Sequence, residues 1–223
     1  MSNPWLDIPL ADYEGHMALP TIGQTQLLSE VFVTALRQYA PRSVAVLGCA
    51  GGNGLDRISS EVTERVVGVD INPDYVMHAR TRFDHQIPQL ELLVGDVQKD
   101  EFSFAPVELV FAGLLFEYVD AEAVLAKIRA MLSPGGTLFT VVQLPSTTTA
   151  EITPSQFASL GALSSVMRLV PPKLLRQLAA AHGYHETEAQ TLKAAGGKEF
   201  QVQAFRLATP NHRLQPMPAS GRD

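Results

Sequence analysis

The chain has 223 residues, of which 46% are hydrophobic and 18% are charged, a length that predicts one domain with a sizeable core. Its formal net charge is −6 and its Lys and Arg residues are scattered, so we expect no nucleic-acid partner. The single cysteine, Cys49, excludes an internal disulfide and favours a cytoplasmic location, and the absence of an apolar run of about 20 residues or a leader-like start excludes a membrane partner.

In chain order, the pattern of apolar residues predicts helices and strands in alternation. A helix is expected over residues 24–39, where Pro41 ends the helical spacing. Strands are expected at 43–47, 65–70, 90–96, 107–113 and 136–144, and further helices at 55–62, 73–83 and 121–132. Because these strands are nearly continuous in apolar residues, they indicate a parallel sheet covered on both faces.

The order of predicted elements changes near the end of the chain. A helix over 172–182 precedes two extended runs, 184–192 and 200–207, which the turn-like sequence AAGGK separates. Strands joined so tightly must be antiparallel. The prediction is an α/β, doubly wound fold over residues 1–208, with a mostly parallel seven-stranded sheet that ends in an antiparallel hairpin. The Pro-rich tail, residues 209–223, is expected to pack poorly.

A glycine-rich loop, VAVLGCAGGNG (44–54), follows the first predicted strand. It lacks the G-x-G-x-x-G spacing of dinucleotide-binding loops, and it has no Gly-Lys-Ser or Gly-Lys-Thr as in phosphate-binding loops. Backbone N–H groups at such a strand-to-helix turn favour an anion, which includes a carboxylate. The alternative is a tight turn that binds nothing.

Two aspartates, Asp70 and Asp96, end the second and third predicted strands. Ligands of open parallel sheets bind beyond the carboxyl ends of the strands, where these side chains and the glycine loop line up. One carboxylate there can accept hydrogen bonds from ribose hydroxyls and the other from an adenine amino group. Helix caps or solvated loop ends are the alternative roles.

At this point the chain resembles the class I S-adenosylmethionine-dependent methyltransferases. VAVLGCAGGNG, VVGVDINP, LLVGDV and LSPGGTLFTVV are similar to motifs of that family, over about residues 27–207. WLDIPLADYEGHM, GQTQLL and FEYVD resemble an uncharacterised bacterial branch. The resemblance implies a Rossmann-like methyltransferase fold and S-adenosylmethionine as cofactor, with S-adenosylhomocysteine as product.

The resemblance also implies roles for residues at matching positions. The methionine part of the cofactor would lie over the loop, the ribose on Asp70, and the adenine beside Ile71, Asp96 and Val97. Cys49 is expected to be a small buried residue of the loop. The full cofactor set comprises Gly48, Cys49, Ala50, Gly52, Asp70, Ile71, Asp96, Val97, Ala112 and Gly113.

Two positions depart from the family pattern. Val46 stands where an acidic residue is common, so the cofactor's ammonium needs another partner: backbone carbonyls near Gly48 and Ala112, with Glu117 or Glu14 as further candidates. Ala50 stands where glycine is common, and we expect its backbone to avoid the left-handed region because it carries a Cβ.

The catalytic candidates are Glu117, Tyr13 and His16. Glu117 matches a substrate-contact position of the family, whereas Tyr13 and His16 precede the first long helix, in the segment 1–40 that would contribute a lid. Ordinary surface or packing roles are the alternative for all three. Gln143 and Tyr118 are further lining candidates, and Phe157, Leu160, Leu163 and Met167 have the spacing of an amphipathic helix in a second lid, 145–170.

The favoured function is in-line methyl transfer to a small organic molecule, with a protein side chain as a weaker candidate acceptor. No Asn-Pro-Pro-Tyr-like segment follows the fourth strand, and no His or Asp cluster predicts a metal site. A methyltransferase-fold module that binds the cofactor or a protein partner without catalysis is the alternative. An NAD-linked oxidoreductase is disfavoured by the glycine spacing. The methyl acceptor and the oligomeric state stay open.

Overall fold

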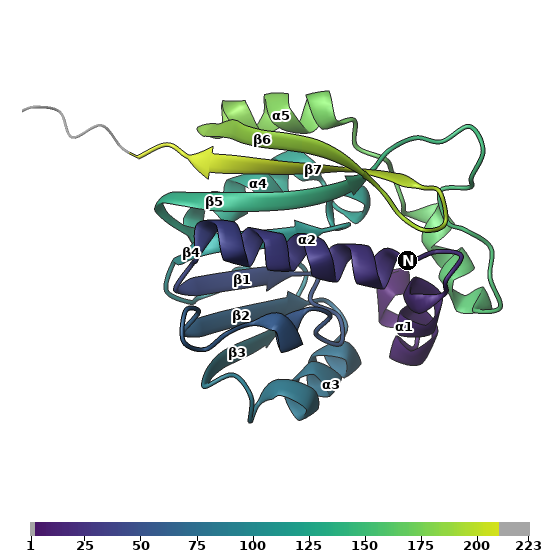
Figure 1. The fold of residues 1–223 in the computed structure, drawn as a ribbon, viewed down its shortest axis with the longest axis horizontal. Helices are drawn as coiled ribbons and strands as arrows, with labels where there is room; N and C mark the ends of the chain where they lie inside the picture. The colour runs from purple at the N-terminus through teal and green to yellow at the C-terminus, as the bar shows by residue number, and fades with distance from the viewer. Residues whose placement is uncertain (1–2, 210–223) are drawn as a thin grey trace, which may run out of the picture.

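A seven-stranded sheet forms the centre of the structure, a computed structural model that describes residues 3–209 (Figure 1). The order across the sheet is β3-β2-β1-β4-β5-β7-β6. Strands β1 to β5 pair in parallel, and β7 is antiparallel to both β5 and β6. This confirms the predicted fold class. The strands are β1 (Ser43–Leu47), β2 (Arg65–Asp70), β3 (Gln89–Val94), β4 (Val107–Gly113), β5 (Leu132–Gln143), β6 (Tyr184–Lys193) and β7 (Glu199–Leu207).

Helices cover both faces of the sheet, as Figure 1 shows for α2 in front of it and α4 behind it. The α-helices are α1 (Leu10–Ala18), α2 (Gln24–Tyr39), α3 (Pro73–Phe83), α4 (Ala121–Met131) and α5 (Pro172–Ala181). Short 3-10 helices are η1 (Pro4–Leu6), η2 (Leu55–Arg57), η3 (Phe116–Tyr118) and η4 (Ala158–Ser165). None of the helices between residues 3 and 209 has the length and apolar character needed to cross a bilayer.

Alternation of side chains along the strands creates two apolar cores. Val44 and Val46 of β1 pack in the core beneath α2 and α3, whereas Ala45 and Leu47 belong to the core beneath α4 and α5. Successive residues of a strand point to opposite faces, so a strand that is apolar throughout can serve both cores. The continuous apolar runs in the sequence therefore have a direct structural reason.

Two predicted helices are wrong. Residues 55–62 form only η2, because Leu55 is the sole buried side chain of the segment and a short helix without a packed face is unstable. Residues 157–167 contain η4 and not an amphipathic α-helix. There Ser164 and Ser165 donate side-chain hydrogen bonds to Gly161 O and Ala162 O, an alternative to α-helical pairing.

Element ends also differ from expectation. β3 stops at Val94, so Asp96 lies in the loop beyond it, and β5 begins at Leu132, which was expected to end a helix. Helix α1 was not predicted. It lies at the carboxyl ends of the parallel strands, beside the tip of the β6–β7 hairpin (Figure 1). Apart from Thr209, the predicted Pro-rich tail 209–223 lies outside the described residues.

Candidate functional site

A cavity opens at the carboxyl edge of the parallel strands, near the point where the strand order reverses between β1 and β4. The loops after β1, β2, β3 and β4, the carboxyl end of β5 and the turn before β7 all contribute to it, and the N-terminal segment covers it. Its lining includes Trp5, Tyr13, His16, Gln24, Gly48, Ala50, Asp70, Ile71, Asp96, Val97, Gly113, Glu117, Tyr118, Gln143 and Lys198.

The glycine loop is held against β2 by backbone hydrogen bonds. The N–H groups of Gly48 and Cys49 donate to Val69 O over 2.8 and 3.1 Å. Gly48 has φ 70°, and Ala50 has φ 45°, so Ala50 does occupy the left-handed region that we expected it to avoid. Its N–H donates to Asp70 Oδ2 over 2.8 Å, and this bond holds the residue in that conformation.

Asp70 is the last residue of β2, and its buried carboxylate faces the cavity. Oδ1 accepts a hydrogen bond from Asn72 N over 2.9 Å, and Oδ2 accepts the bond from Ala50. Burial raises the pKa of this carboxyl to about 6, although the backbone N–H donors act in the opposite direction. The N-cap of α3 is Asn72, so capping does not account for Asp70.

Asp96 lies two residues beyond β3, with a side chain that is largely buried. Its Oδ1 accepts from Gln98 N over 2.9 Å, and Lys99 Nζ lies 2.9 Å from Oδ2. Burial raises the pKa of Asp96, but Lys99 and the Gln98 N–H outweigh this effect, and the pKa falls below its ordinary value. Asp96 is therefore a charged acceptor at neutral pH.

Glu117, on η3 after β4, is 1% exposed. Its Oε1 accepts a hydrogen bond from Gln143 N over 2.6 Å, whereas Oε2 has no hydrogen-bond partner among residues 3–209. Burial raises the pKa of Glu117 to about 7, against the effect of the backbone donors. The cavity thus contains a buried carboxyl group with one free oxygen and a pKa near neutrality, as a general base requires.

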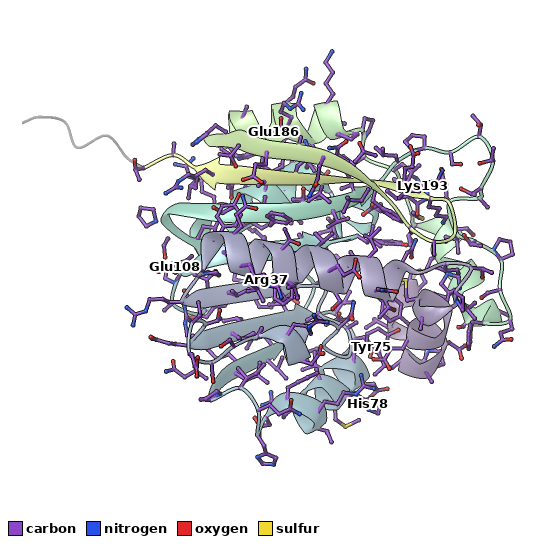
Figure 2. The ribbon with its side chains drawn as sticks, viewed as in Figure 1. Arg37, Tyr75, His78, Glu108, Glu186 and Lys193 are labelled. Atoms are coloured by element: carbon purple, nitrogen blue, oxygen red, sulfur yellow. The ribbon has the colours of Figure 1, made fainter. Side chains whose placement is uncertain are left out.

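Tyr13 and His16 come from α1 and lie over the cavity. The ring of Tyr13 stacks on Tyr75 with centroids 5.9 Å apart, and burial, Asp70 and Glu14 raise the pKa of its hydroxyl. Tyr75 lies beside α1 in Figure 2, and its hydroxyl donates to Ile8 O over 3.0 Å. His16 Nδ1 lies 2.8 Å from Ser155 Oγ. Burial, and to a smaller extent the positive charge of Lys198, lower the pKa of His16.

Three predicted cofactor residues do not line this cavity. Cys49 is buried with its Sγ against Gly68, Gly52 contacts Phe83 on another side of the loop, and Ala112 is buried in the core beneath α4 and α5. Sequence reasoning also missed Trp5, Gln24 and Lys198. A signal existed for Lys198: a strand antiparallel to β5 must begin at the edge where β5 ends.

The structure also separates the candidate partners for the ammonium group of the cofactor by whether they line the cavity. Val46 packs in the core beneath α2 and α3, and the carboxylate of Glu14 forms an ion pair with Arg82 over 2.5 Å. Neither residue lines the cavity, whereas Glu117 does.

Comparison with known proteins finds a similar domain model and similar solved folds. Residues 44–136, from β1 to the start of β5, match a family model described as a methyltransferase domain. This part of the chain is similar to a methyltransferase domain. A search of curated proteins finds no match.

Solved structures of two methyltransferases and a cyclase share the fold at low identity. The N-methyltransferase NodS from Bradyrhizobium japonicum, in complex with S-adenosylhomocysteine, is 15% identical, with 92% of this chain and 99% of that chain covered and a TM-score of 0.66. The magnesium protoporphyrin IX methyltransferase ChlM from Synechocystis, with bound S-adenosylhomocysteine, is 11% identical, with 84% of each chain covered and a TM-score of 0.63. The [4+2]-cyclase SpnF is 11% identical, with 84% and 82% covered and a TM-score of 0.63. At such identities the likeness shows the methyltransferase fold and not the substrate.

Proposed function

We propose that the protein binds S-adenosylmethionine and transfers its methyl group to a small organic molecule. One observation carries the proposal: the glycine loop, Asp70, Asp96 and the buried Glu117 line a single cavity at the carboxyl edge of the sheet. The first three match the family's cofactor contacts, and Glu117 lies on the opposite side of the strand-order reversal, where an acceptor would enter.

The residues of the cavity fit the cofactor's polar groups. Asp70 has two carboxylate oxygens, each with one backbone donor, so lone pairs stay available for ribose hydroxyls. Asp96 can accept from the adenine amino group, with Ile71 and Val97 against the ring. The ammonium partner that Val46 cannot supply would come from backbone carbonyls near Gly48 or from Glu117, whose Oε2 is free among the described residues.

When bound, S-adenosylmethionine supplies a methyl group on a sulfonium sulfur. The protein's part is to align the acceptor in line with that group and to exclude water. Trp5, Tyr13 and the buried Leu160 and Leu163 of η4 line the cavity and would exclude water from it. For an acceptor hydroxyl, Glu117 Oε2 would take the proton as the oxygen attacks the methyl group.

Titration calorimetry with S-adenosylmethionine, S-adenosylhomocysteine and NAD tests the proposal. We expect both sulfur compounds to bind and NAD not to bind. Asp70→Ala and Asp96→Ala should each weaken binding by about 1–3 kcal/mol, the cost of a lost charge-assisted hydrogen bond. No binding of either sulfur compound at millimolar concentration would overturn the proposal.

Glu117→Gln then assigns the role of that residue. A base or acceptor contact predicts slower turnover with nearly unchanged affinity for S-adenosylhomocysteine. A loss of cofactor affinity would instead make Glu117 the partner of the ammonium group, because the neutral amide can no longer pair with the cation.

A module that binds the cofactor or a protein partner without methyl transfer is the second candidate. The observation that favours it is Val46, which leaves the cofactor pocket without the acidic residue common in the family. The [4+2]-cyclase among the similar folds illustrates that this architecture accommodates other chemistry. Binding of S-adenosylhomocysteine, together with no methyl incorporation into any of a broad panel of small molecules, would support this candidate.

A further inference from the structure

Lys198 is a buried cation at the acceptor end of the cavity. It immediately precedes β7, at the tip of the β6–β7 hairpin, and is 6% exposed. Of the residues that line the cavity within 3–209, it is the only Lys or Arg. Its position follows from topology, because β7 runs antiparallel to β5 and begins where β5 ends.

The ammonium group of Lys198 has two neutral partners and no carboxylate partner. Nζ donates to Gln143 Oε1 over 3.3 Å and to the backbone oxygen of Glu151. An ammonium has three N–H donors, so one has no partner among the described residues and can bind a ligand. None of the ion pairs between residues 3 and 209 includes Lys198.

Burying a charge without an ion-pair partner is costly, so an anionic ligand would stabilise the buried ammonium group. Burial lowers the pKa of Lys198 to about 8, and the charge of Glu151 counteracts this only in part. The lysine therefore stays mostly protonated at neutral pH. His16, also over the cavity, has a lowered pKa and adds no second stable positive charge.

The sheet order places Lys198 away from the cofactor half of the cavity. From β1, which precedes Gly48, to β7 there are three strand spacings, or roughly 14 Å, and from β2, which carries Asp70, roughly 19 Å. A cofactor seated on Gly48 and Asp70 leaves the end near Lys198 for another molecule. Apolar side chains also line the cavity, among them Ile152, which follows Glu151, and Leu160, Leu163 and Met167.

We propose that Lys198 binds a carboxylate group of the methyl acceptor, which is therefore an anionic molecule with an apolar body. This inference rests on the proposed function, since it assigns one end of the same cavity to an acceptor. The carboxylate would accept the free N–H of Lys198, and the apolar body would contact the leucine and methionine side chains.

Matched acid and amide probes test the inference in the presence of saturating S-adenosylhomocysteine. Suitable pairs are benzoate and benzamide, phenylpropionate and phenylpropionamide, and decanoate and decanamide, because each pair shares one apolar body. We expect at least one acid to bind wild-type protein about tenfold or more tightly than its amide, measured by titration calorimetry. Lys198→Met should remove this preference and leave S-adenosylhomocysteine affinity unchanged.

Lys193→Met is the matched control. Lys193 ends β6 in the same hairpin, but its side chain is exposed and does not line the cavity (Figure 2). This variant removes the same charge and should keep the acid preference. Circular dichroism and thermal unfolding verify the folding of each variant, and Lys198→Gln provides a second, polar substitution if Lys198→Met does not fold.

The possible outcomes separate the inference about Lys198 from the proposed function. An acid preference that is lost only in the Lys198 variants supports the inference. No preference in any pair, with S-adenosylhomocysteine bound, overturns the inference and leaves the proposed function standing. A folded Lys198 variant with weakened S-adenosylhomocysteine binding also overturns it, because the lysine would then hold the carboxylate of the cofactor. A wild-type protein that does not bind S-adenosylhomocysteine overturns the proposed function itself.

Discussion

Asp70 accepts a hydrogen bond of 2.8 Å from the backbone N–H of Ala50, which joins the end of β2 to the loop after β1. The same carboxylate also accepts from Asn72 N and lines the cavity. Asp70 therefore stabilises the loop conformation and offers lone pairs to a ligand. A conservative substitution is needed to separate the two roles.

Asp70→Asn should weaken the binding of S-adenosylhomocysteine by about 1–3 kcal/mol, because the amide loses the charge and one acceptor oxygen while its shape is kept. Calorimetry measures the affinity, and thermal unfolding verifies the fold. Asp74→Asn, an exposed residue in the first turn of α3, is the control and should bind as wild type does. Equal affinities in wild type and Asp70→Asn would remove Asp70 from the cofactor site.

Ala50→Gly should change the free energy of unfolding by less than about 1 kcal/mol, although it deletes a buried methyl group. Relief of the left-handed backbone at φ 45° offsets the lost packing. Ala45→Gly deletes the same methyl group from the extended backbone of β1 and should cost about 1–2 kcal/mol. Urea unfolding compares the two, and equal losses would contradict the backbone argument.

Glu117→Gln should become more stable relative to wild type as pH rises from about 4.5 to 7. In that range the native Glu117, with a pKa of about 7, holds a proton that the unfolded chain has released, so wild-type stability falls with rising pH. Glutamine does not titrate, and we expect a relative gain of roughly 1–3 kcal/mol above the window.

Urea unfolding at several pH values from about 5 to 8 measures this gain. Glu122→Gln, at an exposed position of α4, is the control for the exchange itself. A stability difference between Glu117→Gln and wild type that does not change with pH would mean that the native carboxyl group titrates as it does in the unfolded chain.

Ser159→Ala should speed the release of S-adenosylhomocysteine by about two- to fivefold, the equivalent of one lost hydrogen bond. Ser159 Oγ donates to Asp12 Oδ2 over 2.6 Å and so joins η4 to α1, the two segments that cover the cavity. Stopped-flow fluorescence of Trp5, the single tryptophan of the chain, reports the rate from within the lining.

Ser164→Ala is the control for this lid interaction, because Ser164 Oγ donates within η4, to Gly161 O over 2.7 Å. It should release the ligand at the wild-type rate. If Ser159→Ala did the same, the contact between α1 and η4 would not limit opening.

Most of the fold could be predicted because local pattern and tertiary packing agree. The apolar strand β1 serves two cores, and Asn72 and Pro73 begin α3 with a cap and a proline. The predicted helices that did not form lie where the local sequence pattern and the tertiary packing disagree. In residues 55–62 the predicted helix had no apolar face, and around Gly161 serine side chains favoured a 3-10 helix.

A place in the cavity lining could be predicted for a residue that ends a strand, as Asp70 does, because parallel strands end at one edge. The conformation of Ala50 was not, since the bond to Asp70 that supports it joins residues 20 positions apart in sequence. Lys198 was missed because the hairpin was interpreted as the end of the sheet and not as part of the cavity wall.

Because β7 is antiparallel to β5, the turn before it lies at the cavity and can vary without changing the parallel strands. The turn 194–197 brings Lys198 to the cavity wall, while β1 to β4 with their loops carry the residues proposed to bind the cofactor. A change in the length or charge of this turn leaves the pairing of β1 with β2 and β4 intact. Under the proposed function, a substituted hairpin turn would change the acceptor that is bound and leave the proposed cofactor site unchanged.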